Sequence, residues 1–271
     1  MVESRSVDAA ALVDLDRYPI SDPTTRAFDE LAAECRSQLD ATGCCILPGF
    51  LRADAVERAR ADAHALTAVA HHSSVMEASA YLELPDESRP EGHARRLGGP
   101  TELRAVPYDR FGADDPLRVL YEWDPLKAFL AAALGKDELF RYDDPLGALN
   151  LAVMIDGDEL WWHFDQTDFV TSIALETAER GGDFEYAPLI RSVDDERYDD
   201  VAAVLRGGSD RVVTVPMTPG TLMLFEGRNS LHRVTPIEGG GVRLVGLLAY
   251  DTKPGTCSSE ILRLVRYGRA T

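Results

Sequence analysis

The sequence predicts a mainly β fold, a sandwich or jelly roll whose outer face is covered by N-terminal helices. From Gly147 onward, eight short runs rich in β-branched, aromatic and other apolar residues alternate with Gly, Pro and Asp. Upstream, helical periodicity prevails. Since amphipathic helices need an apolar surface to cover, we expect them to pack on the β core. A length of 271 residues suits one domain, with helices over about 1–146, the core over about 147–251 and a short C-terminal extension.

The helical part divides into recognisable segments. Residues 24–39 and 51–69 carry apolar side chains at three- and four-residue spacing with charges between them, which predicts two helices. The run GCCILPGF between them indicates a buried strand, and residues 125–134 a shorter helix. Residues 71–115 mix Gly, Pro and charge without lasting periodicity, so we interpret them as a long surface excursion able to cover a pocket.

The β core is expected to follow its apolar runs. They are ALNLAVMI, ELWWHF, FVTSIALE, DFEYAP, RVVTVP, TLMLFEG, SLHRVTP and VRLVGLLAY. A helix over residues 192–205 interrupts the series as an insertion between strands.

Charge and composition exclude several classes of protein. A net charge of −18 repels phosphate backbones, so nucleic acid is not an expected partner. No apolar run approaches a membrane span, and the N-terminus mixes acids into short apolar pieces, unlike a secretory signal. We therefore expect a cytoplasmic protein that acts on a small molecule, as a monomer or homodimer. The four cysteines include an adjacent pair and no CxxC pattern, so we expect free thiols.

A candidate metal site lies in ELWWHFDQTDF. His163 and Asp165 are two residues apart, which places both side chains on one face of a strand. An HxD pair alone is a weak signal, and an ordinary surface pair would be the default. His232, in SLHRVTP, supplies a third donor from a second strand. Two imidazoles and one carboxylate that leave coordination positions open suit non-haem iron(II).

A lone arginine follows in a strongly apolar run. Arg243 lies eleven residues after His232, within GVRLVGLLAY. Burying a guanidinium there is costly unless a carboxylate pairs with it. The far carboxylate of an oxo-acid, held through two hydrogen bonds, would supply that partner.

These motifs together resemble the iron(II)/2-oxoglutarate-dependent dioxygenases, whose core is a double-stranded β-helix. The resemblance implies that His163, Asp165 and His232 bind Fe(II), that Arg243 anchors 2-oxoglutarate, and that O2 is the oxidant. Four segments are similar in sequence to a bacterial branch of this family that contains free amino acid hydroxylases and radical halogenases. They are WHFDQTDF, GGDFEYAP, PGTLMLFEGRNSLHRVTP and RLVGLLAYDTKPG.

The resemblance also bears on the reaction. In the halogenases of that branch a small residue replaces the carboxylate ligand, whereas this chain carries Asp165. Hydroxylation of an unactivated C–H bond in a small polar metabolite, such as a free amino acid or derivative, is therefore expected, and halogenation is disfavoured. Desaturation and cyclisation stay open. A non-catalytic binding protein has no need of all four residues, and a cupin isomerase has little reason to bury Arg243.

Further residues have possible roles that rest on position alone. Asn150 and Thr235 are candidates for contacting the co-substrate, with turn or strand hydrogen bonding as the alternative. Trp161 is a candidate for the substrate pocket, with core filling as the alternative. Glu226 is a candidate acceptor for a ligand histidine.

Charged residues near these motifs suggest substrate contacts. The basic cluster His93, Arg95 and Arg96 would meet an anionic substrate group, unless it belongs to a solvated loop. Asp156, with Asp158 and Glu159, would meet an amine.

Overall fold

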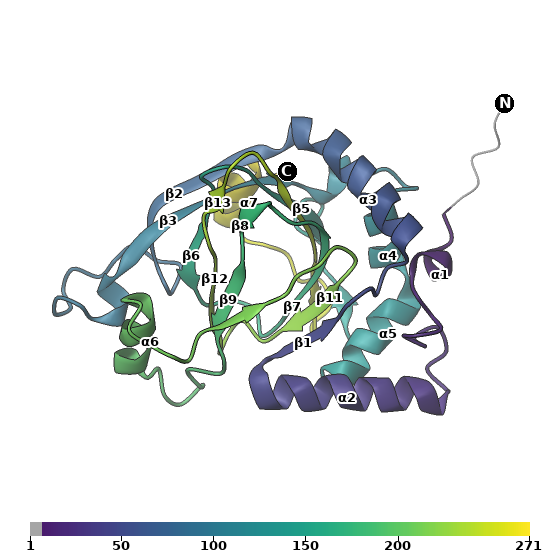
Figure 1. The fold of residues 1–271 in the computed structure, drawn as a ribbon, viewed down its shortest axis with the longest axis horizontal. Coiled ribbons are helices and arrows are strands. Elements are labelled where there is room, and N and C mark those ends of the chain that lie inside the picture. The colour runs from purple at the N-terminus through teal and green to yellow at the C-terminus, as the bar shows by residue number, and fades with distance from the viewer. Residues whose placement is uncertain (1–6) are drawn as a thin grey trace.

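A computed structural model describes residues 7–271 of the chain, and one curled antiparallel sheet dominates it (Figure 1). The first six residues, part of the stretch in which no secretory signal is expected, lie outside the described residues. The strand order is β1-β11-β7-β14-β5-β3-β6-β12-β9-β10, with β2 paired to β3. The sheet bends into a half-barrel, which confirms the prediction of a mainly β jelly-roll core with flanking helices.

The elements of the described chain are as follows. The large sheet contains β1 (Cys44–Leu47), β2 (His71–Ser79), β3 (Gly98–Val106), β5 (Leu149–Met154), β6 (Leu160–His163), β7 (Val170–Glu176), β9 (Phe184–Ala187), β10 (Val213–Val215), β11 (Leu222–Phe225), β12 (Leu231–Val234) and β14 (Arg243–Leu248). Two small sheets pair β4 (Phe140–Arg141) with β15 (Tyr250–Asp251) and β8 (Arg180–Gly181) with β13 (Ile237–Glu238). The helices are α1 (Ala9–Leu12), α2 (Arg26–Thr42), α3 (Ala53–Leu66), α4 (Pro116–Glu122), α5 (Asp124–Ala133), α6 (Tyr198–Leu205) and α7 (Glu260–Tyr267), with short 3-10 turns at Thr67–Val69, Ala94–Arg96 and Tyr108–Arg110.

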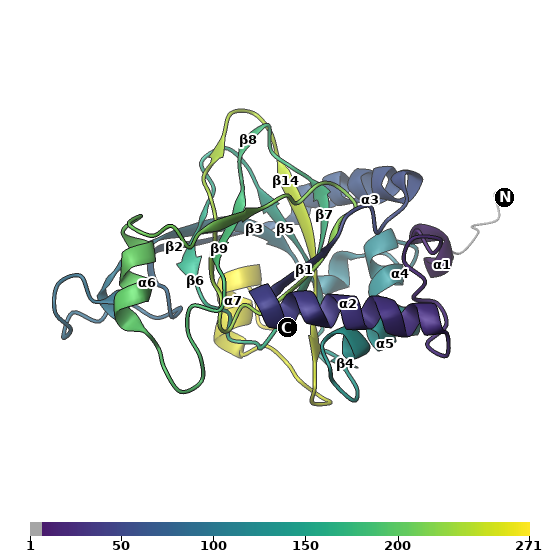
Figure 2. The same ribbon diagram turned by 60° about the horizontal axis from the view of Figure 1, so that its bottom comes forward.

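The eight predicted β-runs all form strands, and the side-chain alternation along them separates two cores. On the outer face, Ile173 and Leu224 pack with helix residues such as Phe28 and Phe129. On the inner face, residues one position away, such as Ala174, line a second cluster. Helices α2 to α5 gather beside the outer face (Figures 1 and 2). The predicted arrangement of helices on the β core is thus observed, while the single-domain organisation stays a prediction.

The interpretation of residues 71–115 as an irregular excursion is wrong. Strands β2 and β3 occupy much of this segment and form a long antiparallel pair inside the region predicted to be helical. The run TELRAV alternates inward Leu103 and Ala105 with polar Glu102 and Arg104, a period of two that indicates a strand. Because β2 is an edge strand, its sequence HHSSVMEAS lacks the apolar run that a buried strand shows.

Other boundaries refine the sequence predictions. The insertion helix α6 begins at Tyr198 rather than Ser192, and α4 and α7 were not predicted. Three of the four free cysteines are buried, and Cys257 is exposed. Within residues 7–271, no helix is long and apolar enough to cross a bilayer.

Candidate metal centre

The three predicted ligands meet where β6 and β12 pair. His163 and His232 are direct partners in the antiparallel register, and their ring centroids lie 4.2 Å apart. Asp165 follows β6, with its Oδ1 at 4.0 Å from His163 Nε2 and its Oδ2 at 3.5 Å from His232 Nε2. One ligand atom from each residue lies within 4.8 Å of the others, so the three side chains can share one metal ion.

Backbone carbonyls orient both imidazoles. His163 Nδ1 lies 2.7 Å from the Trp161 carbonyl oxygen, and His232 Nδ1 lies 3.0 Å from that of Ser230. A carbonyl only accepts, so Nδ1 carries the hydrogen and Nε2 is the nitrogen turned toward Asp165. Burial, with the neighbouring His232, lowers the pKa of His163 to about 4, which keeps this ring neutral and able to coordinate. Glu226, the expected acceptor, does not fill that role.

The backbone of Asp165 is held by a hydrogen bond, whereas one of its carboxylate oxygens has no partner. Its backbone N–H donates to the Gly227 carbonyl oxygen at 3.0 Å. Its Oδ2 is buried and has no hydrogen-bond partner. A Cβ at position 227 would collide with this carboxylate, so the site depends on glycine there. A buried carboxylate oxygen without a partner is costly, and a cation bound between it and the two Nε2 atoms would remove that cost.

Arg191, which sequence reasoning missed, packs on both chain segments beside Asp165. Its Cζ lies 3.7 Å from the ring centroid of Phe164, the residue between the two HxD ligands. Its Nε donates to the Arg228 carbonyl oxygen at 2.7 Å, and its Nη1 pairs with Glu196 at 2.9 Å. Arg191 therefore holds the HxD strand against the turn that contains Gly227, which is a positioning role.

Arg243 is buried on the inner face, as its apolar run predicted. Its one hydrogen bond runs from Nη1 to Met154 Sδ at 3.8 Å, and no ion pair of the described chain includes it. Burial lowers the pKa of Arg243 to about 10, although the charge of Asp183 acts in the opposite direction. The glycine at 182 has φ of +69°, and a Cβ there would lie 3.2 Å from Arg243 Cδ. The half-barrel thus holds a buried cation that has no ion-pair partner among the described residues.

The two other predicted co-substrate residues differ in their contacts. Thr235 Oγ1 accepts from the Asp183 N–H at 3.0 Å, so it supports a turn, the alternative weighed for it. Asn150 shares the inner face of β5 with Ala152 and Met154. In register it lies opposite Leu247, which lies opposite Ser172. The Ser172 hydroxyl is buried without a hydrogen-bond partner. This part of the inner face therefore contains a hydroxyl that is free to bind a ligand, which the sequence did not reveal.

The residues expected to meet an amine are mostly engaged. Asp156 Oδ1 accepts from the Gly239 N–H at 2.8 Å. Asp158 is buried and pairs with Arg104 at 2.5 Å. Trp161 packs over Gly99, and its buried Nε1 lacks a partner. Trp161, the separate candidate for the substrate pocket, therefore keeps a free donor, while no hydrogen bond or ion pair of the described chain engages the side chain of Glu159.

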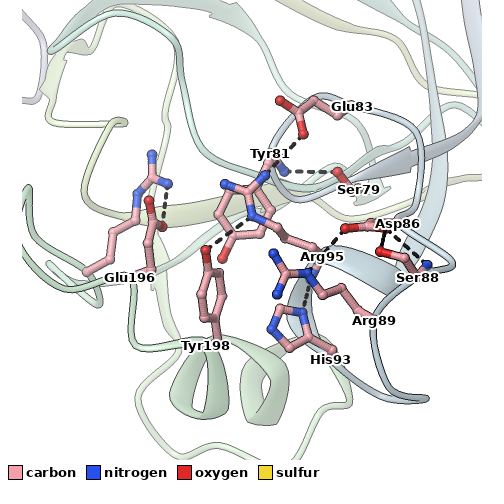
Figure 3. A network of polar contacts seen from close by, with 11 residues as sticks. Ser79, Tyr81, Glu83, Asp86, Ser88, Arg89, His93, Arg95, Glu196 and Tyr198 are labelled. Carbon is pink, nitrogen blue, oxygen red and sulfur yellow. Dashed lines mark hydrogen bonds and ion pairs between the residues drawn. The ribbon is translucent and has the colours of Figure 1, made fainter.

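The basic cluster lies in the loop between β2 and β3 and contacts α6 (Figure 3). His93 Nδ1 accepts from the Arg95 N–H at 3.1 Å, and Arg96 donates to the Arg89 carbonyl oxygen. The guanidinium of Arg95 lies over the Tyr81 ring, pairs with Glu83 at 3.1 Å and donates to Tyr198 Oη at 3.2 Å. These contacts engage Arg95 fully and His93 and Arg96 in part, and the role of the cluster in substrate binding stays a prediction.

Comparison with known proteins places the chain in a family. The profile of the Halogenase D family (HalD) matches residues 28–261. The chain therefore belongs to the Halogenase D family. A search of curated protein sequences found no significant match.

Solved structures share the fold at low sequence identity. AviO1 from Streptomyces viridochromogenes Tue57 is 20% identical with a TM-score of 0.56, over 84% of this chain and 97% of that chain. The epimerase SnoN, solved with Fe3+, α-ketoglutarate and nogalamycin RO, is 18% identical with a TM-score of 0.55, over 85% and 93%. A 2OG-Fe(II) oxygenase family protein from Burkholderia pseudomallei is 17% identical with a TM-score of 0.52, over 82% and 91%. The chain thus has the fold of the 2-oxoglutarate- and iron(II)-dependent oxygenases.

Proposed function

We propose that this protein is an iron(II)- and 2-oxoglutarate-dependent oxygenase that hydroxylates a small polar metabolite. The observation that carries the proposal is the meeting of His163, His232 and Asp165, whose Oδ2 is buried without a partner. These residues would hold Fe(II), and the buried Arg243 would pair with the far carboxylate of 2-oxoglutarate. When bound, the iron, the oxo-acid and O2 supply the oxidising chemistry, and the protein supplies position and charge.

The chain's own residues prepare the site for that chemistry. The backbone carbonyls hold each imidazole with Nε2 toward the centre, so little reorganisation is needed on binding. Phe184 and Phe225 pack against the His232 ring, with centroids 5.6 and 4.8 Å away, and exclude water from that side. Metal binding would therefore satisfy Asp165 Oδ2, and oxo-acid binding would neutralise the buried charge of Arg243.

Halogenation is the second candidate, because the family bears that name. The position of Asp165 favours hydroxylation. Its carboxylate oxygens lie 4.0 and 3.5 Å from the two Nε2 atoms, so Asp165 supplies a third ligand where the halogenases of the similar branch carry a small residue. SnoN, solved with nogalamycin RO, supports a small-molecule substrate, whereas a prolyl hydroxylase from Trichoplax adhaerens of similar fold was solved with a peptide.

The test is succinate formation from 2-oxoglutarate by the purified protein with iron(II) and O2, alone and with candidate substrates. We expect dependence on both iron and oxo-acid, and a product sixteen mass units heavier, the mass of one oxygen atom. A product two units lighter would indicate desaturation or cyclisation. A chlorinated product in the presence of chloride would overturn the preference for hydroxylation, and the absence of any succinate would overturn the proposal.

A further inference from the structure

The C-terminal helix α7 leaves its apolar side uncovered. Its sequence, EILRLVRY, places four large aliphatic residues on one side of the helix. They are Ile261, Leu262, Leu264 and Val265, and their exposed fractions run from 43 to 75%. Single exposed aliphatic residues are common in proteins, whereas an amphipathic helix normally buries its apolar side. Four adjoining exposed side chains on one helix therefore indicate a contact surface.

Contacts on the opposite side hold α7 in this orientation. Tyr267 is buried in the cluster of the inner face of the half-barrel. Arg263 pairs at 3.3 Å with Asp144, whose side chain is fully buried. Gly268, which ends the helix with φ of +71°, packs so closely on His71 that a Cβ there would lie 2.6 Å from the ring. Turning the helix to bury its aliphatic side would break all three contacts, so this side lies at the surface of the single chain.

Both ends of α7 are capped, which fixes the spacing of the exposed side chains. Ser259 Oγ accepts from the Leu262 N–H at 3.2 Å, and the Gly268 N–H donates to the Leu264 carbonyl oxygen at 2.9 Å. The aliphatic side is therefore presented by a formed helix.

The sequence of α7 is symmetric about position 263. On the two sides of this position stand two leucines, then two β-branched residues, then two charged residues of opposite sign. These pairs are Leu262 with Leu264, Ile261 with Val265, and Glu260 with Arg266. If two copies of α7 pack antiparallel with a two-fold axis at this level, each residue lies level with its match in the other copy. Aliphatic side chains then meet aliphatic side chains, and each acid lies level with a base.

Charge favours a second copy over the other molecules that such a surface could bind. Glu260 and Arg266 make no hydrogen bond or ion pair in residues 7–271, so both charges are available to another copy. Antiparallel packing also brings the positive end of each helix dipole beside the negative end of the other. An anionic bilayer is disfavoured, because the chain carries a net charge of −18 and the neighbouring Arg263 and Arg269 are neutralised by ion pairs.

We propose that two copies of this chain form a symmetric homodimer through the aliphatic sides of antiparallel α7 helices. The proposal goes beyond the oxygenase function and depends on no residue of the metal centre. A standard protein interface buries about 800 Å² on each partner, more than one short helix offers. The dimer is therefore expected to be weak and to depend on protein concentration, with a dissociation constant on the order of 10 µM.

The experiment is sedimentation velocity of the purified full chain over a range of protein concentrations. The wild type should shift from monomer to dimer mass between about 1 and about 300 µM. Val265→Glu and Leu264→Glu should each weaken association roughly 30-fold or more, because the two-fold axis places two carboxylates in one apolar contact. The matched control is Val193→Glu, which adds the same charge at an aliphatic side chain that is 89% exposed and lies outside α7. The control should associate like the wild type.

Salt distinguishes a second copy from a lipid surface. Raising NaCl from about 50 to about 500 mM should strengthen the dimer, because salt screens the repulsion between two acidic chains. Binding of arginines to anionic lipid would instead weaken. Co-sedimentation with phosphatidylcholine vesicles that contain phosphatidylglycerol measures the second possibility.

Three results would overturn the proposal. They are a wild type that stays monomeric at every concentration, a dimer that both α7 variants leave intact, and vesicle binding by the wild type that the variants lose. Thermal unfolding of dilute samples checks that each variant is folded, and little change in Tm is expected because Leu264 and Val265 are exposed. At higher concentration the Tm of the wild type should rise, since the dimer stabilises the folded state, and the Tm of the two α7 variants should not.

Discussion

The metal centre and the network around Arg95 are both rich in polar groups, yet they differ in what their atoms contact. At the centre, Asp165 Oδ2 is buried without a partner, and the Nε2 atoms of two histidines face it. In the loop network, Arg95 pairs with Glu83 and Tyr198, and Arg89 pairs with Asp86 (Figure 3). The charged groups of the loop network have partners, although the Tyr81 hydroxyl within it is buried without one. It is the unpaired buried charge at the centre, and not an unpaired polar atom by itself, that indicates a ligand. Both clusters contained predicted site residues, so contacts distinguish them better than sequence does.

The largest expected effect is at the centre. His163→Ala, Asp165→Ala and His232→Ala should each abolish turnover and iron binding, because three donors are the minimum for this geometry. Without metal, Asp165→Ala should leave Tm unchanged or raise it, since the variant removes an unpartnered buried carboxylate. Iron content, succinate formation and thermal unfolding measure the three effects. Near-normal turnover in one variant would show that its residue is not a ligand.

Arg243 should produce the next largest effect. Replacing one partner of a buried charge pair typically costs about 3 to 5 kcal/mol, so Arg243→Ala should weaken 2-oxoglutarate binding by hundreds-fold or more. Arg243→Met preserves much of the side-chain volume and separates loss of charge from loss of packing. Iron binding should be spared in both variants. A titration of the iron-loaded variants with 2-oxoglutarate gives the affinity, and an unchanged value would refute the assignment.

The loop network should show the smallest effect on catalysis. Arg95→Met removes a partly exposed ion pair and a cation–π contact, for an expected loss of about 1 kcal/mol in the free energy of unfolding. KM for the substrate should change less than about threefold, because Arg95 is occupied within the protein. Denaturant unfolding and steady-state kinetics measure the two quantities. A rise in KM of about tenfold or more would instead show that the loop contacts the substrate.

Much of the fold could be predicted from sequence because its signals are local. The eight β-runs and the helices before them follow from periodicities of two and of three to four residues. Strand β2 was missed because an edge strand needs no continuous apolar run. Helix α7 was treated only as part of a C-terminal extension, although its apolar residues recur at helical spacing. The face of α7 that packs on the protein carries two arginines and a tyrosine, and statistics of residue burial do not favour such a charged face as the buried one.

Site residues could be predicted where the sequence places a residue type in a context that structure alone rarely requires. Arg243 in an apolar strand and the HxD pair with His232 belong to that group, and the structure brings the three candidate ligands together. Ser172 and Arg191 could not be found in this way. Ser172 depends on strand register across β14, and Arg191 depends on the loop from β9 to α6, which passes beside the HxD segment. Both need contacts between residues far apart in sequence.

The close approach of Asp165 to Gly227 restricts how this site can change over evolutionary time. While position 165 carries aspartate, any side chain at position 227 meets its carboxylate, so only glycine is tolerated. A lineage that first replaces residue 165 with glycine frees position 227 to vary, because a Cβ at 227 would lie 2.9 Å even from Asp165 Cβ. The reverse order passes through a clashing intermediate. Laboratory evolution toward a different metal environment would therefore be expected to acquire the substitution at 165 before any at 227.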